Sequence, residues 1–173
     1  LCRENDFTFK KDKNSVVLCG RLNGGSYKIR GGVSSQFISG LLFALFYLGE
    51  PSSLEIIPPF ESRSYVELTV SALCSFGADV KFTDEYRVDV TPTGLHALSG
   101  KIEGDYSNAA FLDGFNYIGG NVEIGNLKPD SLQGDRVYGE YFDKISKGTP
   151  TLDISDCPDL GPVLIALAAL KNG

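Results

Sequence analysis

The sequence predicts an α/β (α+β) fold in which strands and helices alternate and the order of elements begins again along the chain. Segments rich in β-branched residues alternate with segments whose apolar residues recur at helical spacing. Glycines and short polar residues separate the two kinds of segment. The chain has 173 residues, of which 42% are hydrophobic and 22% charged, so it can bury a core in one domain or in two small ones.

The first complete unit is predicted between residues 26 and 92. Its helices and strands follow the order strand, helix, strand, helix, strand, strand. The predicted ranges, in that order, are 26–31, 35–48, 52–58, 64–77, 79–84 and 86–92.

The second helix of this unit has signals at both ends. Ser64 and Glu67 have the spacing of a capping box, and Gly77 stands where such a helix would end. Tyr65 and Phe76 mark the two ends of an apolar face at helical spacing. Capping by Ser64 would leave Ser62 available for a ligand.

After a turn region at residues 93–100 the order of elements begins again. Strands are expected at 101–104, 121–126 and 151–156, and helices at 105–120, 131–145 and 160–170. The three strand-to-helix junctions align without a gap, which places Ser35, Asn108 and Asp159 at equivalent positions. Capping of the helix is the simplest explanation of Ser107 and Asn108.

The junction before the first helix has more polar groups than one cap requires. Ser34 and Ser35 double the cap, and Gln36 adds a donor and an acceptor. Gly31 and Gly32 would let a ligand approach the backbone. Since the N-terminus of a helix attracts anions through its free N–H groups and its dipole, this cluster is a candidate phosphate site.

The composition excludes several classes of function. A net charge of −6 leaves no basic stripe for a nucleic acid, and the longest apolar run, residues 41–48, is too short to span a bilayer. His96 is the only histidine, so no histidine-based metal cluster is possible. The four cysteines lack C-x-x-C spacing, which predicts reduced thiols and a cytoplasmic protein. Small molecules are therefore the expected partners, and neither nucleic acid nor membrane is expected.

Five ordered motifs resemble those of the 5-enolpyruvylshikimate-3-phosphate synthase family. They are GGVSSQFISGLLFAL, SRSYVELTVSALCSFGADV, EGDYSNAAFLDGFNYIGG, SLQGD and DISDCPDLGPVLIALAA. The resemblance implies an inside-out α/β barrel fold made of βαβαββ units in two domains. It also implies that the enolpyruvyl group is transferred from phosphoenolpyruvate to a hydroxyl of shikimate 3-phosphate, with release of phosphate, and that no metal or organic cofactor is needed.

On this pattern the chain is expected to be a central piece of a longer enzyme. Residues 1–100 would be part of the first domain and contain one complete unit, and residues 101–173 would be an incomplete part of the second. The Lys and Arg residues with which the family binds its anionic substrates have no counterpart here, and Arg63 is the main cation near the candidate pocket. We therefore expect little or no catalysis from the piece alone. The full-length protein is expected to be a monomer, and the piece could associate with itself through exposed apolar surface.

The resemblance also implies roles for individual residues. The serines of the Ser-Ser-Gln motif would hold the phosphate of shikimate 3-phosphate, and Gln36 would also reach phosphoenolpyruvate. Asp159 would contact the attacking hydroxyl and act as its base, a role compatible with capping the helix that follows. Ser62 would be a further phosphate ligand and Tyr65 a wall of the pocket. The substrate-binding residues implied are Ser34, Ser35, Gln36, Ser62, Tyr65 and Asp159.

Three alternatives stay open. The sister enolpyruvyl transferase that acts on UDP-N-acetylglucosamine shares the fold but normally presents a reactive cysteine on a loop, whereas Cys157 precedes Pro158 at a helix start. A non-catalytic binding or folding module would use the serines as caps only. A regulatory phosphosugar-binding domain is the third alternative.

Overall fold

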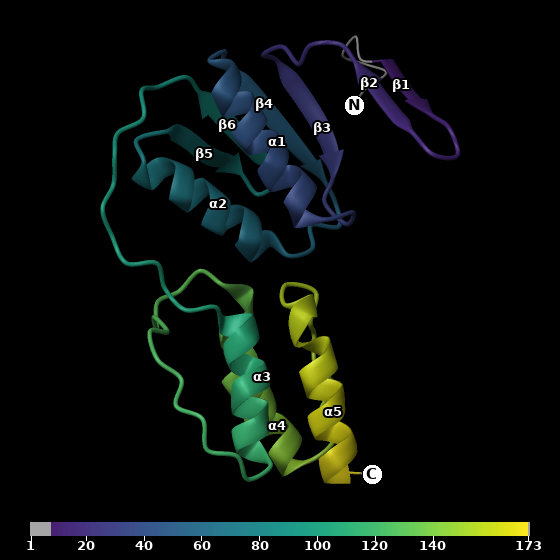
Figure 1. Ribbon diagram of the computed structural model, residues 1–173, viewed down its shortest axis with the longest axis vertical. Helices are drawn as coiled ribbons and strands as arrows, with labels where there is room; N and C mark the ends of the chain where they lie inside the picture. The colour runs from purple at the N-terminus through teal and green to yellow at the C-terminus, as the bar shows by residue number, and fades with distance from the viewer. Residues whose placement is uncertain (1–7, 173) are drawn as a thin grey trace. The chain divides into compact units, whose positions relative to one another are not determined.

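The computed structural model describes residues 8–172, which divide into two compact units (Figure 1). Within the described residues, unit 1 comprises 8–61 and 69–98, and unit 2 comprises 62–68 and 99–172. Helix α2 (Arg63–Ser75) contributes its first residues to unit 2 and the rest to unit 1. None of the described helices is both long enough and apolar enough to cross a membrane.

Unit 1 contains a four-stranded mixed sheet and the predicted order of helices and strands. The strands lie in the order β3-β4-β6-β5, with β3 parallel to β4 and the other neighbouring pairs antiparallel. The parallel pair is connected through helix α1 (Ser35–Leu48), as in other βαβ units. The strands are β3 (Ser26–Arg30), β4 (Ser52–Ile57), β5 (Asp79–Asp84) and β6 (Arg87–Thr91).

One face of this sheet is buried beneath the helices (Figure 1). In β4, Leu54 and Ile56 are buried whereas Glu55 between them is exposed. In α1 the fully buried residues Ile38, Leu42 and Leu45 recur at helical spacing. The two periodicities that predicted the elements are therefore the ones that form the core.

The ends of both helices follow from local sequence. Gly49 ends α1 with a φ of 71°, and Gly77 follows α2 with a φ of 96°, both in the left-handed region that glycine adopts without strain. The Ala78 N–H donates to the Leu73 carbonyl at 3.1 Å, which closes the end of α2 as the sequence predicts.

A hairpin precedes the sheet and was not predicted. Strand β1 (Thr8–Lys11) pairs antiparallel with β2 (Val16–Cys19), and every residue of both strands is exposed. The apolar run of β2 is a weak strand signal. Because neither face of the hairpin is buried, its residues do not alternate between apolar and polar, and alternation is what identifies a strand in a sequence.

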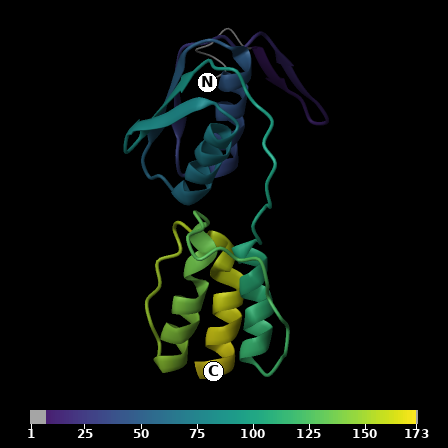
Figure 2. The same cartoon turned by 90° about the vertical axis from the view of Figure 1, so that its left-hand side faces the viewer.

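Unit 2 is built around three helices that lie side by side (Figure 2). They are α3 (Tyr106–Tyr117), α4 (Tyr138–Lys147) and α5 (Gly161–Asn172), and the short 3-10 turns η2 (Gly134–Val137) and η3 (Pro158–Leu160) precede the last two. The core contains Ala110, Phe142, Ile145, Leu160, Val163, Leu164 and Leu167.

The strands predicted at 101–104, 121–126 and 151–156 are not formed in the described structure. The first two segments do lie beside each other, since the Gly104 N–H donates to the Asn126 carbonyl at 2.8 Å and the Asn126 amide to the Ile102 carbonyl at 2.9 Å. One backbone bond is not a ladder, and a strand is stable only with repeated bonds to a neighbour. In the third segment the Asp153 carboxylate accepts from the Ser155 N–H at 2.9 Å, which bends the chain.

The cap of α3 is also different from the prediction. Asp105, not Ser107 or Asn108, occupies the N-cap position, and its carboxylate accepts from the Ser107 N–H at 2.9 Å. Asn108 instead donates its side-chain amide to Asp105 at 2.6 Å. A carboxylate at this position also interacts favourably with the helix dipole, which explains why aspartate takes the cap in preference to its neighbours.

Candidate active site

The Ser-Ser-Gln motif lies at the N-terminus of α1 in unit 1. Ser34 is the N-cap, and its Oγ accepts from the Gln36 N–H at 3.2 Å. The first turn of α1 carries no acidic residue that would neutralise the helix dipole. Among residues 8–172, neither the Ser35 hydroxyl nor the Gln36 side chain has a hydrogen-bond partner. One serine therefore caps the helix, while the other and the glutamine are available to a ligand.

The two glycines before this motif have a packing role. Gly31 is buried, and a Cβ there would lie 2.6 Å from the Pro59 carbonyl oxygen and 2.9 Å from the Phe60 Cα. A Cβ on Gly32 would meet the Pro59 ring at 3.1 Å. The glycines thus allow close packing against the segment after β4, and the approach of a ligand to their backbone stays a prediction.

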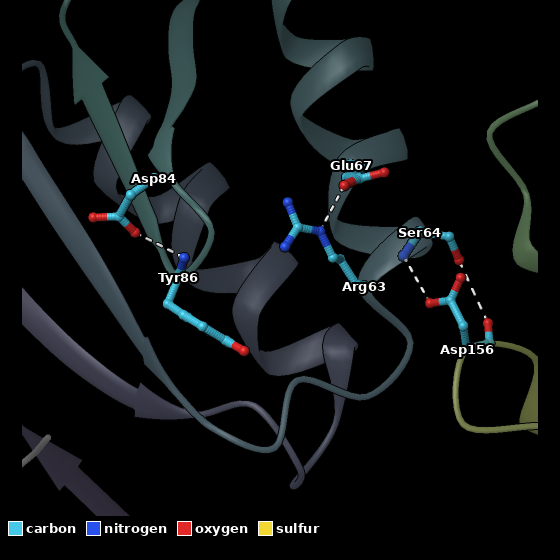
Figure 3. Close-up of polar contacts among 6 residues, drawn as sticks. All are labelled: Arg63, Ser64, Glu67, Asp84, Tyr86 and Asp156. Atoms are coloured by element: carbon cyan, nitrogen blue, oxygen red, sulfur yellow. Dashed lines mark hydrogen bonds and ion pairs between the residues drawn. The ribbon is translucent and has the colours of Figure 1, made fainter.

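The start of α2 is capped from a distant part of unit 2, which corrects the predicted capping box. The helix begins at Arg63, so Ser64 lies inside it, and the Ser64 N–H donates to the Asp156 carboxylate at 3.0 Å (Figure 3). The predicted partner, Glu67, instead accepts from the Arg63 guanidinium at 2.7 Å (Figure 3). An aspartate 92 residues away cannot be found by local spacing, and for that reason the sequence pattern misled.

Ser62 adopts an uncommon backbone conformation just before α2. Its φ is 51°, in the left-handed region that costs a non-glycine residue about 1 kcal/mol. Two bonds hold it there, since its N–H donates to the Ser155 carbonyl at 3.0 Å and its own carbonyl accepts from the Tyr65 N–H at 3.2 Å. Strain of this kind is found most often at functional sites.

Tyr65 is paired with a buried aspartate. Its hydroxyl donates to Asp135 Oδ2, and Asp135, in η2, is completely buried. Burial raises the pKa of Asp135, and the charges of Asp159, Asp105 and Asp156 add to the rise. Burial and the bond to Asp135 likewise raise the pKa of Tyr65, so its hydroxyl keeps its proton at neutral pH.

Asp159 lies close enough to this pair for its charge to raise the pKa of both Tyr65 and Asp135. It is exposed in the turn η3, and Cys157 rather than Asp159 occupies the N-cap position there. Within the part of the chain that the structure describes, the Asp159 carboxylate forms no hydrogen bond or ion pair. Capping, the alternative role suggested for Asp159, is thus not what the structure shows.

The sequence profile of the family described as EPSP synthase (3-phosphoshikimate 1-carboxyvinyltransferase) matches residues 6–173. The chain belongs to the EPSP synthase family. A 3-phosphoshikimate 1-carboxyvinyltransferase of Clostridium kluyveri is 37% identical over 179 residues, which cover 93% of this chain and 42% of the relative. One from Clostridium botulinum is 35% identical and covers 96% of this chain, and one from Clostridium perfringens is 32% identical and covers 99%. The chain spans less than half the length of each of these relatives.

Sequence reasoning missed the residues that hold Tyr65 and the start of α3 in unit 2. Gln133 accepts from the Tyr106 N–H at 2.8 Å and donates to the Gly104 carbonyl at 2.9 Å, which ties η2 to the start of α3. Two residues further along, Asp135 reaches Tyr65. Both lie in the SLQGD motif, which the sequence analysis quoted for its resemblance alone. That motif was the available signal.

Cys157 is not the reactive cysteine of the sister transferase. The residue is buried, and burial raises the pKa of its thiol to about 11. It therefore stays protonated at neutral pH and packs in the core of unit 2. Within residues 8–172, no group of three or more His, Cys, Asp or Glu side chains is arranged to hold a metal ion, although several aspartates surround Tyr65.

Proposed function

We propose that this chain contributes to an enzyme that transfers the enolpyruvyl group from phosphoenolpyruvate to shikimate 3-phosphate. The observation that carries the proposal is the family match over residues 6–173. The transfer is a step of the shikimate pathway to aromatic amino acids. Because the chain covers less than half of its relatives, the complete activity is proposed for the longer gene product that contains it.

The proposed shikimate 3-phosphate site includes residues at the starts of α1 and α2. Ser34 and Ser35 bind the phosphate with the N–H groups of α1, and Ser62 supplies a further hydroxyl. The side chains at the mouth of α1 support this role, because the Ser35 hydroxyl and the Gln36 amide have no partner among the described residues. Gln36 reaches the ring of shikimate 3-phosphate and phosphoenolpyruvate, and Tyr65 forms a wall of the pocket.

Asp159 acts as the base for the attacking hydroxyl. The oxygen of that hydroxyl forms a bond to C2 of phosphoenolpyruvate, and its proton goes to Asp159 while C3 is protonated by an acid that we do not assign to this chain. Phosphate then leaves from C2 as a proton is lost from C3, which restores the double bond in the product. Support comes from the exposed position of Asp159 and from the effect of its charge on Tyr65.

Charge supports the view that the chain alone is inactive. Both substrates are anions, yet the chain has a net charge of −6 and Arg63 is already paired with Glu67 at 2.7 Å. A helix N-terminus contributes only about 0.3 to 1 kcal/mol toward binding an anion at an exposed site. Further cations from the longer protein must complete the site. No metal or organic cofactor takes part in this proposal.

The proposal also includes the arrangement of the longer protein. We propose that residues 1–100 belong to its first domain and residues 101–173 to its second. The boundary between the two units at residue 98 supports this proposal, although residues 62–68 belong to unit 2. We propose a monomer in the cytoplasm. Size-exclusion chromatography and cell fractionation of the complete gene product test these two points.

The deciding assay measures phosphate released from shikimate 3-phosphate and phosphoenolpyruvate. Release by the complete gene product and none by the 173-residue chain supports the proposal. Absence of release by both refutes it and favours a non-catalytic binding module. Preference of the site for shikimate 3-phosphate over sulfate, measured by calorimetry, separates a substrate site from simple capping.

Two variants of the complete gene product test the residue roles. Ser35→Ala should weaken shikimate 3-phosphate binding about tenfold to a hundredfold, since one hydrogen bond to a charged group is lost. Ser107→Ala, a serine in the first turn of α3, is the matched control and should bind normally. Asp159→Ala should lower turnover by about 10² to 10⁴, whereas the exposed Asp130→Ala should not.

A further inference from the structure

Asp135 is costly to bury and stability does not explain its presence. Its side chain is 0% exposed, and Oδ1 is buried without a hydrogen-bond partner. Among the described residues no Lys or Arg forms an ion pair with it, and the charges that act on it are those of Asp105, Asp156 and Asp159. A buried carboxylate with one unsatisfied oxygen and only like charges around it calls for a functional explanation.

The backbone around Asp135 is held by several contacts. The Ser131 hydroxyl accepts from the Gln133 N–H at 3.1 Å, and Gln133 is fixed to the start of α3 by both ends of its amide. At position 134 a Cβ would lie 2.3 Å from the Asp156 carbonyl oxygen, so glycine is the residue that fits there. These contacts fix the position of the Asp135 carboxylate, and that carboxylate receives the hydroxyl of Tyr65.

We propose that Asp135 is a positioning residue that orients Tyr65 toward the substrate. This inference rests on the proposed function, in which Tyr65 forms a wall of the shikimate 3-phosphate pocket. The bond to Asp135 fixes the tilt of the Tyr65 ring. Since the hydroxyl proton is directed to Asp135, the Tyr65 oxygen can only accept from a ligand. An accepting oxygen in acidic surroundings recognises a ring hydroxyl of the substrate and not its phosphate.

The test compares four forms of the complete gene product: wild type, Asp135→Asn, Tyr65→Phe and the double variant. Asn keeps the shape of the side chain and an acceptor oxygen but removes the charge, so shikimate 3-phosphate should bind about fivefold more weakly. Tyr65→Phe should bind about tenfold more weakly. The double variant should match Tyr65→Phe within about twofold, because Asp135 acts through Tyr65.

Glu103→Gln is the matched control. Glu103 also has a buried oxygen without a partner, and its other oxygen accepts from the Ser131 hydroxyl at 3.0 Å. Its charge is not among those that raise the pKa of Tyr65, so the affinity of Glu103→Gln should equal that of wild type. Asp135→Asn should unfold at the same urea concentration as wild type or at a higher one, since it removes an uncompensated buried charge.

A measurement without substrate tests the pair by itself. The ¹³Cζ resonance of Tyr65, assigned from its absence in Tyr65→Phe, should move in Asp135→Asn and stay unchanged in Glu103→Gln. If wild type binds no shikimate 3-phosphate, the proposed function fails and this inference fails with it. If wild type binds shikimate 3-phosphate but the double variant binds it about fivefold more weakly than Tyr65→Phe, the inference alone is overturned. Unfolding of Asp135→Asn or an unmoved resonance also overturns it.

Discussion

Gly134 packs closely against Asp156 and against Ser64 at the start of α2. A Cβ added there would lie 2.3 Å from the Asp156 carbonyl oxygen, 2.6 Å from Ser64 Oγ and 3.1 Å from Asp156 Oδ2. The nearest of these atoms belongs to the backbone and cannot move alone. Gly134→Ala must therefore displace the turn that carries Asp156.

The cost of this substitution has two parts. Overpacking of a dense site costs about 1 to 3 kcal/mol. Displacing Asp156 also weakens its 3.0 Å bond from the Ser64 N–H, a helix-capping bond that contributes about 0.5 to 2 kcal/mol. Since the turn can relax in part, we expect the free energy of unfolding to fall by about 2 to 4 kcal/mol.

Urea unfolding followed by circular dichroism measures the effect. With a slope of about 1 to 3 kcal/mol per molar urea, the midpoint of Gly134→Ala should lie about 1 to 2 M below that of wild type. Gly139→Ala in α4 is the matched control, because nothing lies within 4 Å of its Cβ. Alanine there should stabilise the helix by about 0.5 to 1 kcal/mol. A midpoint for Gly134→Ala equal to that of wild type would refute the reasoning.

Three other substitutions or conditions give definite expectations. Asp156→Ala should lower the free energy of unfolding by about 0.5 to 2 kcal/mol, because it leaves the Ser64 N–H without an acceptor. Asp156→Asn keeps an acceptor oxygen and should lower it by less. Equal urea midpoints for the two variants would contradict this. Ser34→Ala should cost about 1 kcal/mol through loss of its bond from the Gln36 N–H, measured by thermal unfolding. The Cys157 thiol keeps its proton in the folded state up to a pKa of about 11, above the value of about 8.5 in an unfolded chain, so stability should fall as pH rises from 8.5 toward 11. Alkylation at pH 8, read by mass spectrometry, should modify the exposed thiols but not Cys157.

Unit 1 could be predicted well because its signals are local. The spacing of Ile38, Leu42 and Leu45 predicts a helix, and the structure has it at Ser35–Leu48. The alternation around Leu54 and Ile56 predicts a strand with one buried face, which is observed. Gly77 ends α2 because a left-handed residue is needed there. Each of these features depends on residues within a few positions of one another.

Unit 2 was predicted less well because its structure depends on distant contacts. The segments 101–104, 121–126 and 151–156 have strand composition, yet a strand exists only where a neighbour supplies repeated bonds. Asp156 caps α2 from 92 residues away, so the capping box formed by Ser64 and Glu67 looked correct and was wrong. The burial of Asp135 is likewise invisible in a sequence, where an aspartate in a turn is normally exposed.

The sequence by itself determined the family, the α/β class and the helix starts that carry Ser35, Gln36, Ser62 and Asp159, since motifs and periodicity are properties of neighbouring residues. Tertiary structure alone decided which of the polar residues would be used in capping and which would remain available. It placed the carboxylate of Asp135 against the hydroxyl of Tyr65 across 70 residues of chain. A hydrogen bond requires two groups at one point in space, and only the packed core of unit 2 brings these two together.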